Sequence, residues 1–369
     1  MNGKSIRTFL GANTPNGFFS YYEPFIKDRK AYVIKGGPGT GKSSLMKKVA
    51  SEVLKKDIFT EYAYCSSDPD SLDGVLFPEL STVLVDGTPP HTLEPPIPGA
   101  LGGIINIGDY WNERILQRSL KEIFLLQDKI QKCFKRCYHF LGAAGNIYSD
   151  ISETANGYLD EKKATRFINN FMRKNFPKSK SGHKEISKRF LSGITPKGYI
   201  TFKDTIYTLC DKVFVFKDEF FISPFFMEKA ADYLYNAGYD FYAFYSPIAP
   251  CEISHIAIPE ASIALVTAEK GIDFEPVGAQ KTHLKRFLNE DFSFIKNRMS
   301  FAKKIFNICV KEAVSSLIKE KALHDDLEEI YIEAMDWSES KTAIQWNRKF
   351  ELAKTYYEKN GNLDVPVSY

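Results

Sequence analysis

The stretch that decides the fold is residues 31–53, AYVIKGGPGTGKSSLMKKVASEV. Its first four residues are apolar and predict a buried strand, and its last third repeats apolar residues at helical spacing and predicts a helix. Between them lies the loop GGPGTGKSS, which follows the pattern G-x-x-x-x-G-K-S. Strand, glycine loop and helix in this order predict a phosphate-binding loop. The apolar positions of the helix are Leu45, Met46, Val49, Ala50 and Val53.

The residue types of this loop fit the binding of a nucleoside triphosphate. Glycines let consecutive backbone N–H groups turn toward an anion, and the beginning of the helix adds partial positive charge. We expect Lys42 to reach the outer phosphates and the Ser43 hydroxyl to ligate Mg²⁺. The predicted nucleotide-binding residues are Gly36, Gly37, Pro38, Gly39, Thr40, Gly41, Lys42, Ser43 and Ser44.

At these residues the chain resembles the P-loop NTPases. Together with CSSDPDSLDG at residues 65–74 and DGTPPH at residues 86–91, the loop is similar to that of a bacterial family of proposed ATPases built from two tandem P-loop domains. The resemblance spans most of the chain. It implies a nucleotide-binding fold that uses ATP, or another nucleoside triphosphate, with Mg²⁺, and it leaves the cellular role open.

The chain contains an internal repeat. The segment FLGANTPNGF at residues 9–18 recurs as FLSGITPKGY, 181 residues later. Such a duplication predicts two α/β halves, and strands that alternate with helices predict mainly parallel sheets flanked by helices. The expected strands are 31–35, 61–65 and 82–85 in the first half and 212–216, 240–245 and 263–266 in the second.

Long helical patterns follow each set of strands. Apolar residues keep helical spacing across residues 116–141 and 295–317, and further helical segments are expected near 161–173 and 340–357. A polar, basic and glycine-punctuated stretch separates the halves and is interpreted as a solvated linker. The predicted organisation is a P-loop domain at 1–177, a basic linker at 178–186 and a second P-loop-like domain at 187–369.

The second half lacks the residues of a phosphate loop. The sequence KDEFFISPFF, residues 217–226, stands where the glycine loop stands in the first half. No glycine nest can form there, two carboxylates would repel a triphosphate, and Pro224 removes an N–H donor. We therefore expect a degenerate domain that does not bind nucleotide in the ordinary way.

Acidic residues and a histidine that the second repeat has lost are candidate members of the same site. Asp86 ends a predicted strand, where P-loop NTPases keep an acidic residue, so we expect it to hold Mg²⁺ with Ser43. Asp68 before Pro69 fits a helix N-cap as well as a functional role. The catalytic candidates are Lys42, Asp86, Asp70, Asp73 and His91; the counterparts of Asp86, Asp70, Asp73 and His91 are Thr267, Cys251, Ser254 and Ile272.

Composition excludes several classes of protein. The 369 residues are 44% hydrophobic and 26% charged, as in globular proteins, and a net charge of +3 gives no electrostatic reason to expect a nucleic-acid or membrane partner. The six cysteines contain no C-x-x-C pair, which argues against structural zinc and a disulfide framework. Neither a signal peptide nor an apolar stretch of membrane-spanning length is present, so we expect a cytoplasmic protein.

These features predict a Mg²⁺-dependent ATPase that transfers the γ-phosphoryl group to water and uses only the first half. Two alternatives stay open. The chain could be a small-molecule or nucleotide kinase whose acceptor binds at residues 68–73, at the carboxyl edge of the sheet. It could also be a nucleotide-dependent switch that is not an enzyme and uses its second half to bind a protein partner.

Overall fold

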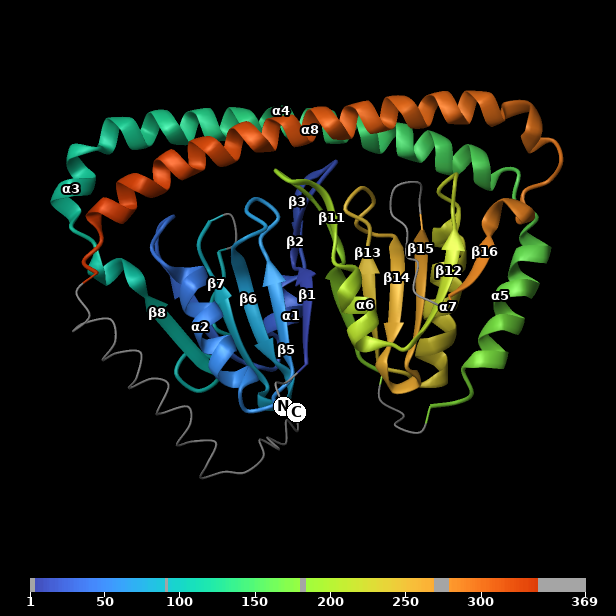
Figure 1. Cartoon of the computed structure of the whole chain (residues 1–369), viewed down its shortest axis with the longest axis horizontal. Helices are drawn as coiled ribbons and strands as arrows, with labels where there is room; N and C mark the ends of the chain where they lie inside the picture. Colours follow the sequence, from blue (N-terminus) through green and yellow to red (C-terminus); the bar gives the residue numbers. More distant parts are fainter. Residues whose placement is uncertain (1–3, 90–91, 180–183, 269–278, 338–369) are drawn as a thin grey trace.

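A computed structural model describes residues 4–89, 92–179, 184–268 and 279–337. Its centre is a 12-stranded sheet in the order β16-β12-β15-β14-β13-β9-β1-β5-β6-β7-β4-β8, so each repeat supplies six adjacent strands (Figure 1). The strands of the first repeat are β1 (Ser5–Phe9), β4 (Lys30–Lys35), β5 (Thr60–Tyr64), β6 (Leu72–Phe77), β7 (Thr82–Asp86) and β8 (Gly102–Asn106). Those of the second are β9 (Ile186–Phe190), β12 (Lys212–Lys217), β13 (Phe241–Tyr245), β14 (Ile253–Ile258), β15 (Ile263–Ala268) and β16 (Gln280–His283).

The prediction of an α/β fold with mainly parallel strands flanked by helices is confirmed, but both halves share one continuous sheet where separate sheets were expected. Each expected strand is present within a residue or two of its predicted bounds. Six strands of the sheet were not predicted, namely β1, β6 and β8 and their counterparts β9, β14 and β16. Of these, β6 and β14 run antiparallel to both of their neighbours. Because β6 is antiparallel, its first residues lie at the edge of the sheet where the parallel strands β4 and β7 end.

The two repeats meet at their first strands. Phe9 of β1 pairs with Phe190 of β9, its counterpart in the repeat. Beside this pair lie two hairpins, and Asn13 of the first donates a hydrogen bond of 3.1 Å from Nδ2 to the carbonyl of Ile194 in the second. The hairpins are β2 (Gly11–Thr14) with β3 (Gly17–Ser20), and β10 (Ser192–Thr195) with β11 (Gly198–Thr201).

A buried ion pair reinforces this junction. Arg189 of β9 donates from Nε to Glu61 Oε1 at 2.5 Å and from Nη2 to Glu61 Oε2 at 3.2 Å. Thr8 Oγ1 donates a third hydrogen bond to Glu61, and the Arg189 guanidinium lies 4.7 Å from the centre of the Phe25 ring. Both charged groups are buried, so removing either partner would leave the other uncompensated in a low-dielectric site.

Helices cover both faces of the sheet. The two helices that follow β4 and β12 are α2 (Lys42–Leu54) and α7 (Ser223–Ala237). Met46, Ala50 and Val53 of α2 pack on the sheet, as the helical spacing of these residues predicts. The other short helices are α1 (Tyr22–Ile26), α3 (Glu113–Arg118), α5 (Glu161–Asn175) and α6 (Lys203–Leu209). The predicted helix at 340–357 and residues 180–183 of the predicted linker lie outside the described residues.

Two long helices cross the molecule beside the sheet. Figure 1 shows α4 (Leu120–Asn156) and α8 (Phe292–Ala334) side by side along one edge, each reaching from its own repeat over the other. Apolar residues, among them Ile123, Leu126 and Leu327, are buried where the two helices pack together. The two packing helices expected from the sequence are therefore confirmed. None of the described helices carries an apolar stretch long enough to cross a bilayer.

A buried carboxyl group lies in this helix pair. Glu320 of α8 is 1% exposed, and its Oε2 has no hydrogen-bond partner within the described ranges. Burial raises the pKa of Glu320 to about 8, against the opposing charge of Lys321. Between its ordinary pKa of 4.5 and about pH 8 the folded chain holds a proton that the unfolded chain has lost, so stability should fall as pH rises through this window.

Replacing Glu320 by glutamine should remove this loss of stability. We expect Glu320→Gln to gain on the order of 2–4 kcal/mol relative to the unmodified chain between pH 5 and pH 9, measured by urea unfolding across the pH range. Glu312→Gln, at an exposed position of the same helix, is the control and should follow the unmodified chain. Parallel pH profiles for Glu320→Gln and the unmodified chain would contradict the prediction.

Candidate functional site

The glycine loop joins the end of β4 to the beginning of α2, at the carboxyl edge of the parallel strands. Gly39 and Gly41 have φ values of +66° and +85°, a left-handed conformation that glycine adopts without steric cost. The Thr40 hydroxyl donates a hydrogen bond of 2.8 Å to the Gly37 carbonyl and so closes the loop on itself. Gly41 is the N-cap of α2 and gives no side-chain acceptor to the first N–H groups of the helix.

Lys42 and Asp86 lie together beside this loop. The Lys42 ammonium donates to the carbonyls of Gly36 and Gly37, at 3.1 and 2.5 Å, and is 3.6 Å from Asp86 Oδ2. Strand pairing causes this proximity, because Ile34 of β4 is the register partner of Asp86 on β7. Burial raises the pKa of Asp86, while the Lys42 charge and hydrogen bonds from Thr88 oppose the shift.

Ser43 connects the helix to the neighbouring strand. Its Oγ accepts a hydrogen bond of 3.0 Å from the backbone N–H of Leu72, the first residue of β6. The hydroxyl therefore lies between the beginning of α2 and the beginning of β6. Ser44, the next residue, is exposed on the first turn of the helix.

Asp73 joins this cluster through β6. Gly74 pairs with Val85, so Asp73 and Asp86 are the next residues along two neighbouring strands. A register shift in the β5–β6 pair makes Asp73 the extra residue of a bulge, and its Oδ2 accepts a 2.7 Å hydrogen bond from the Tyr22 hydroxyl. Burial raises the pKa of Asp73 to about 6, against hydrogen bonds and the Lys42 charge that lower it.

The other predicted acidic residues contact the second repeat. Asp70 is exposed and forms an ion pair with Lys197 at 2.5 Å, which lowers the pKa of Asp70. Asp68 accepts hydrogen bonds from the Asp70 N–H and the Ser71 hydroxyl and lies 3.6 Å from Lys321 of α8. Asp68 caps a turn, not the helix that the sequence suggested, because β6 begins at Leu72. His91 lies outside the described residues.

The end of α8 covers the glycine loop, a contact that sequence reasoning missed. A Cβ atom at Gly37 would lie 2.7 Å from the Tyr331 ring, and one at Gly39 would lie 2.9 Å from the Glu328 carbonyl. Backbone hydrogen bonds hold this end of the helix, since the Asn112 N–H donates to the Ala334 carbonyl. The second repeat therefore supplies one wall of the site in the first.

A group of possible metal ligands lies on the same part of α8. Ligand atoms of His324, Asp325 and Glu328 are within 4.8 Å of one another, and His324 is 3.5 Å from Glu328. Lys321 forms an ion pair with Asp325 and so supplies a positive charge to this group without a metal. Ser43 and Asp86, the residues expected from the sequence to hold Mg²⁺, offer hydroxyl and carboxylate oxygens, the hard ligands that Mg²⁺ prefers.

The corresponding loop of the second repeat carries its own anion. Asp218 is 2% exposed, and its two carboxylate oxygens accept hydrogen bonds from the N–H groups of Phe220, at 3.0 Å, and Ser223, at 2.7 Å. Ser223 begins α7, so the carboxylate occupies the anion position at this helix N-terminus. The sequence predicts that the carboxylates of this loop repel a triphosphate. In the structure, the Asp218 carboxylate also fills the position that a bound anion would take.

No family model, curated protein or solved structure matches this chain.

Because α8 packs on the glycine loop, a methyl group added at Gly37 should lower the free energy of unfolding. Gly37→Ala should destabilise the protein by roughly 1–3 kcal/mol, because its Cβ would overlap the Tyr331 ring and approach Trp111 at 3.2 Å. Thermal unfolding should show a lower Tm. Gly103→Ala in β8 is the control, since a Cβ there meets nothing within 4 Å. Equal Tm values for the two variants would mean that the contact with α8 is not maintained in solution.

Proposed function

We propose that the first repeat binds a nucleoside triphosphate, with ATP the expected substrate, and hydrolyses it with Mg²⁺. The observation that carries the proposal is the contrast between the two helix N-termini. In the second repeat the Asp218 carboxylate accepts a hydrogen bond from the N–H of Ser223, the first residue of α7. In the first repeat Gly41 supplies no side-chain acceptor to α2, and Lys42 adds a positive charge beside it. This arrangement suits an anion that is not part of the chain.

The residues around the loop fit the parts of a phosphoryl-transfer site. Lys42 is within reach of the loop that would surround the outer phosphates, and it would stabilise the charge that develops on them. Ser43 and Asp86 would hold Mg²⁺, which neutralises phosphate charge when bound. In the structure both groups make protein contacts, Ser43 with the Leu72 N–H and Asp86 with Thr88, so ligand binding would exchange these hydrogen bonds.

The reaction is attack of a water oxygen on the γ-phosphorus with cleavage of the bond between that phosphorus and the β,γ-bridging oxygen. Asp73 is the described carboxyl group best suited to accept the water proton. Its raised pKa of about 6 lies near neutral pH, where a general base is most effective. Since Tyr331 and Glu328 contact the loop, binding of a triphosphate requires this end of α8 to share the space or to shift.

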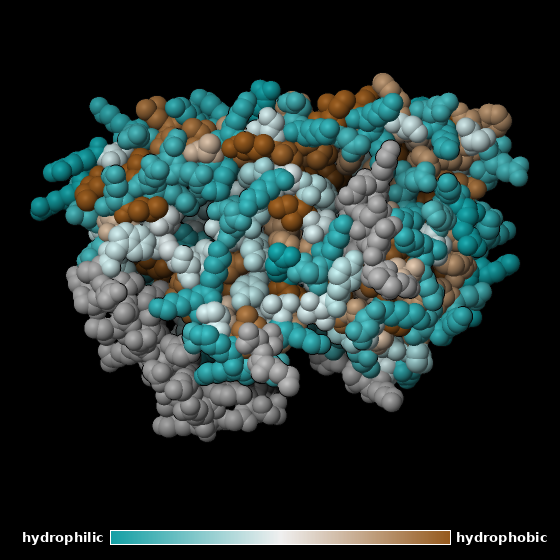
Figure 2. Space-filling view, viewed as in Figure 1, coloured by the Kyte–Doolittle hydropathy of each residue, from teal (hydrophilic) through white to brown (hydrophobic). Residues whose placement is uncertain are grey.

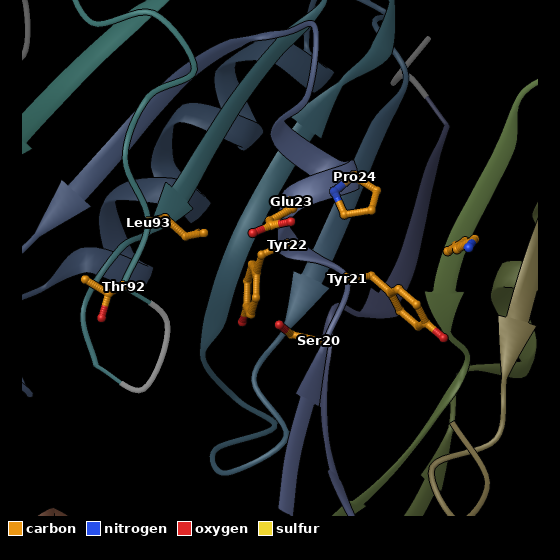
Figure 3. A pocket seen from close by; sticks show the side chains of 8 residues that line it. Ser20, Tyr21, Tyr22, Glu23, Pro24, Thr92 and Leu93 are labelled. Atoms are coloured by element: carbon orange, nitrogen blue, oxygen red, sulfur yellow. The ribbon is translucent and has the colours of Figure 1, made fainter. Parts of the chain in front are cut away.

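A kinase is the second candidate, and a pocket favours it. A pocket of about 440 Å³, a size that suits a small ligand, is lined by Tyr21, Tyr22, Thr92 and Leu93. Figure 3 shows the Tyr22 side chain between Thr92 and Leu93 on one side and Tyr21 on the other. The Tyr22 hydroxyl binds Asp73, so the pocket adjoins the predicted catalytic carboxyl group. An acceptor hydroxyl bound there would take the place of water. A rate that depends on an added acceptor would favour the kinase over the hydrolase.

Lys42→Ala tests the hydrolase directly. We expect release of phosphate from Mg·ATP by the purified chain without an acceptor, and a loss of about 100-fold or more in Lys42→Ala, because a charged donor to the transition state is removed. Lys48→Ala, at an exposed position of the same helix, should retain the rate. Binding of ATP without phosphate release would exclude the hydrolase and favour the kinase or the switch.

Calorimetry should find one nucleotide per chain. The reason is that the Asp218 carboxylate already accepts hydrogen bonds from the N–H groups of the second loop, and three buried apolar residues, Phe220, Phe221 and Ile222, follow it. Titration of the Lys42→Ala variant should then show no tight site. Two equivalent sites per chain would contradict this account of the second repeat.

A further inference from the structure

One exposed aromatic residue lies beside the glycine loop. Most of the large apolar side chains that the structure exposes belong to α4 and α8, and Figure 2 shows hydrophobic residues along the rim that these helices form. Trp337, just beyond the end of α8, is 54% exposed and lies instead against Gly41, the N-cap of α2. A Cβ atom at Gly41 would lie 3.6 Å from the Trp337 ring, an ordinary van der Waals distance. The indole therefore borders the place where the glycine loop joins α2.

Hydrogen bonds hold this indole in place although it is exposed. Its Nε1 donates to the Ile332 carbonyl at 3.1 Å, so the ring folds back along the last turn of α8. The backbone just before it is joined to the first repeat, because Met335 forms a β-bridge with Trp111. The next N–H, that of Asp336, donates to the Tyr110 carbonyl at 2.9 Å. A ring held in this way loses little side-chain entropy when a ligand stacks on it.

The glycine loop is more open at Gly41 than at its earlier glycines. Gly37 and Gly39 face α8 so closely that a Cβ atom at either would overlap it. At Gly41, apart from its chain neighbours, Trp337 is the only described residue within 4 Å of such an atom. Ser44, on the first turn of α2, is exposed. A triphosphate held at the loop would therefore extend its ribose and base toward the side that Trp337 borders.

The other end of the helix pair has a similar arrangement with a different residue. At each end, one β-bridge joins the residue after a 3₁₀ helix to a residue just beyond a long helix. The two bridges are Trp111 with Met335 and Leu288 with Leu159. Two residues beyond the bridge stands Trp337 in the first case and Glu161 in the second. The end of the molecule whose loop carries its own anion therefore has no aromatic ring at this position.

We propose that Trp337 stacks on the base of the bound nucleotide and that the site takes purine nucleoside triphosphates. This inference rests on the proposed function and adds how the base is recognised. Stacking uses the flat face that every base has, so Trp337 does not distinguish adenine from guanine. Purines offer a larger face than pyrimidines and bind more tightly. The first repeat would hold the phosphates and the segment after α8 the base, so the two ends of one ligand contact different halves of the chain.

A comparison of ATP with inorganic tripolyphosphate, which has no base, tests the proposal on the purified full chain. We expect Trp337→Ala to lose about 5- to 150-fold in affinity for Mg·ATP, measured by calorimetry, and to bind Mg·tripolyphosphate like the unmodified chain. Trp337→Phe keeps an aromatic face and should retain most of the affinity, whereas Trp337→Leu is apolar without such a face and should not. Tyr207→Ala, at an exposed aromatic residue of α6, is the control and should bind both ligands normally.

The unmodified chain should also bind Mg·ATP and Mg·GTP more tightly than Mg·CTP and Mg·UTP, and Trp337→Ala should lose this preference. Unchanged affinity of Trp337→Ala for ATP would overturn the proposal and leave the nucleotide site standing. An equal loss for ATP and tripolyphosphate would also overturn it, because Trp337 would then act through packing on the loop. If the unmodified chain bound neither ligand, the proposed function itself would fail, and this inference with it.

Discussion

The first N–H groups of a helix need a hydrogen-bond acceptor, and the two repeats meet this need differently. In the second repeat the buried Asp218 carboxylate accepts hydrogen bonds from the first N–H of α7 and from the Phe220 N–H in the loop before it, and aromatic residues close the loop. In the first repeat the residue at the N-cap is a left-handed glycine without a side chain, and a lysine follows it. The same backbone unit thus holds a carboxylate of its own at the helix N-terminus in one half, and in the other half its N-cap residue offers no side-chain acceptor.

The two loops are linked through the contacts that join the repeats. The Glu61–Arg189 pair and the Phe9–Phe190 bridge join the two sets of strands, and α4 and α8 cross between them. The contacts at the two ends of the helix pair correspond. Tyr331 of α8 lies on the first loop, and Tyr148 of α4 stacks on Phe221 of the second at 4.5 Å. Each loop is therefore covered by a helix of the other repeat.

Much of the fold follows from local patterns, and the contacts across the repeats do not. The strand, the glycine loop, α2 and the two long helices were predictable from short-range spacing. β6 was missed because LDGVLF lacks strict alternation and contains Asp73 and Gly74, residue types that are rare in strands. Without β6, the sequence gives no reason for Asp73 to approach Asp86. Asp70 illustrates the limit for single residues: its partner, Lys197, is 127 residues away. No local pattern predicts that Tyr331 packs on Gly37.

Because α8 covers a loop near the beginning of the chain, that loop is synthesised long before the helix that packs on it. The glycine loop leaves the ribosome early, whereas Tyr331 and the rest of the covering turn follow about 300 residues later, roughly 15–60 s at ~5–20 residues per second. Throughout that interval the loop has its glycines, its lysine and its neighbouring strands but not its cover. The glycine loop of the nascent first repeat is therefore uncovered until the segment of α8 that packs on it has been synthesised.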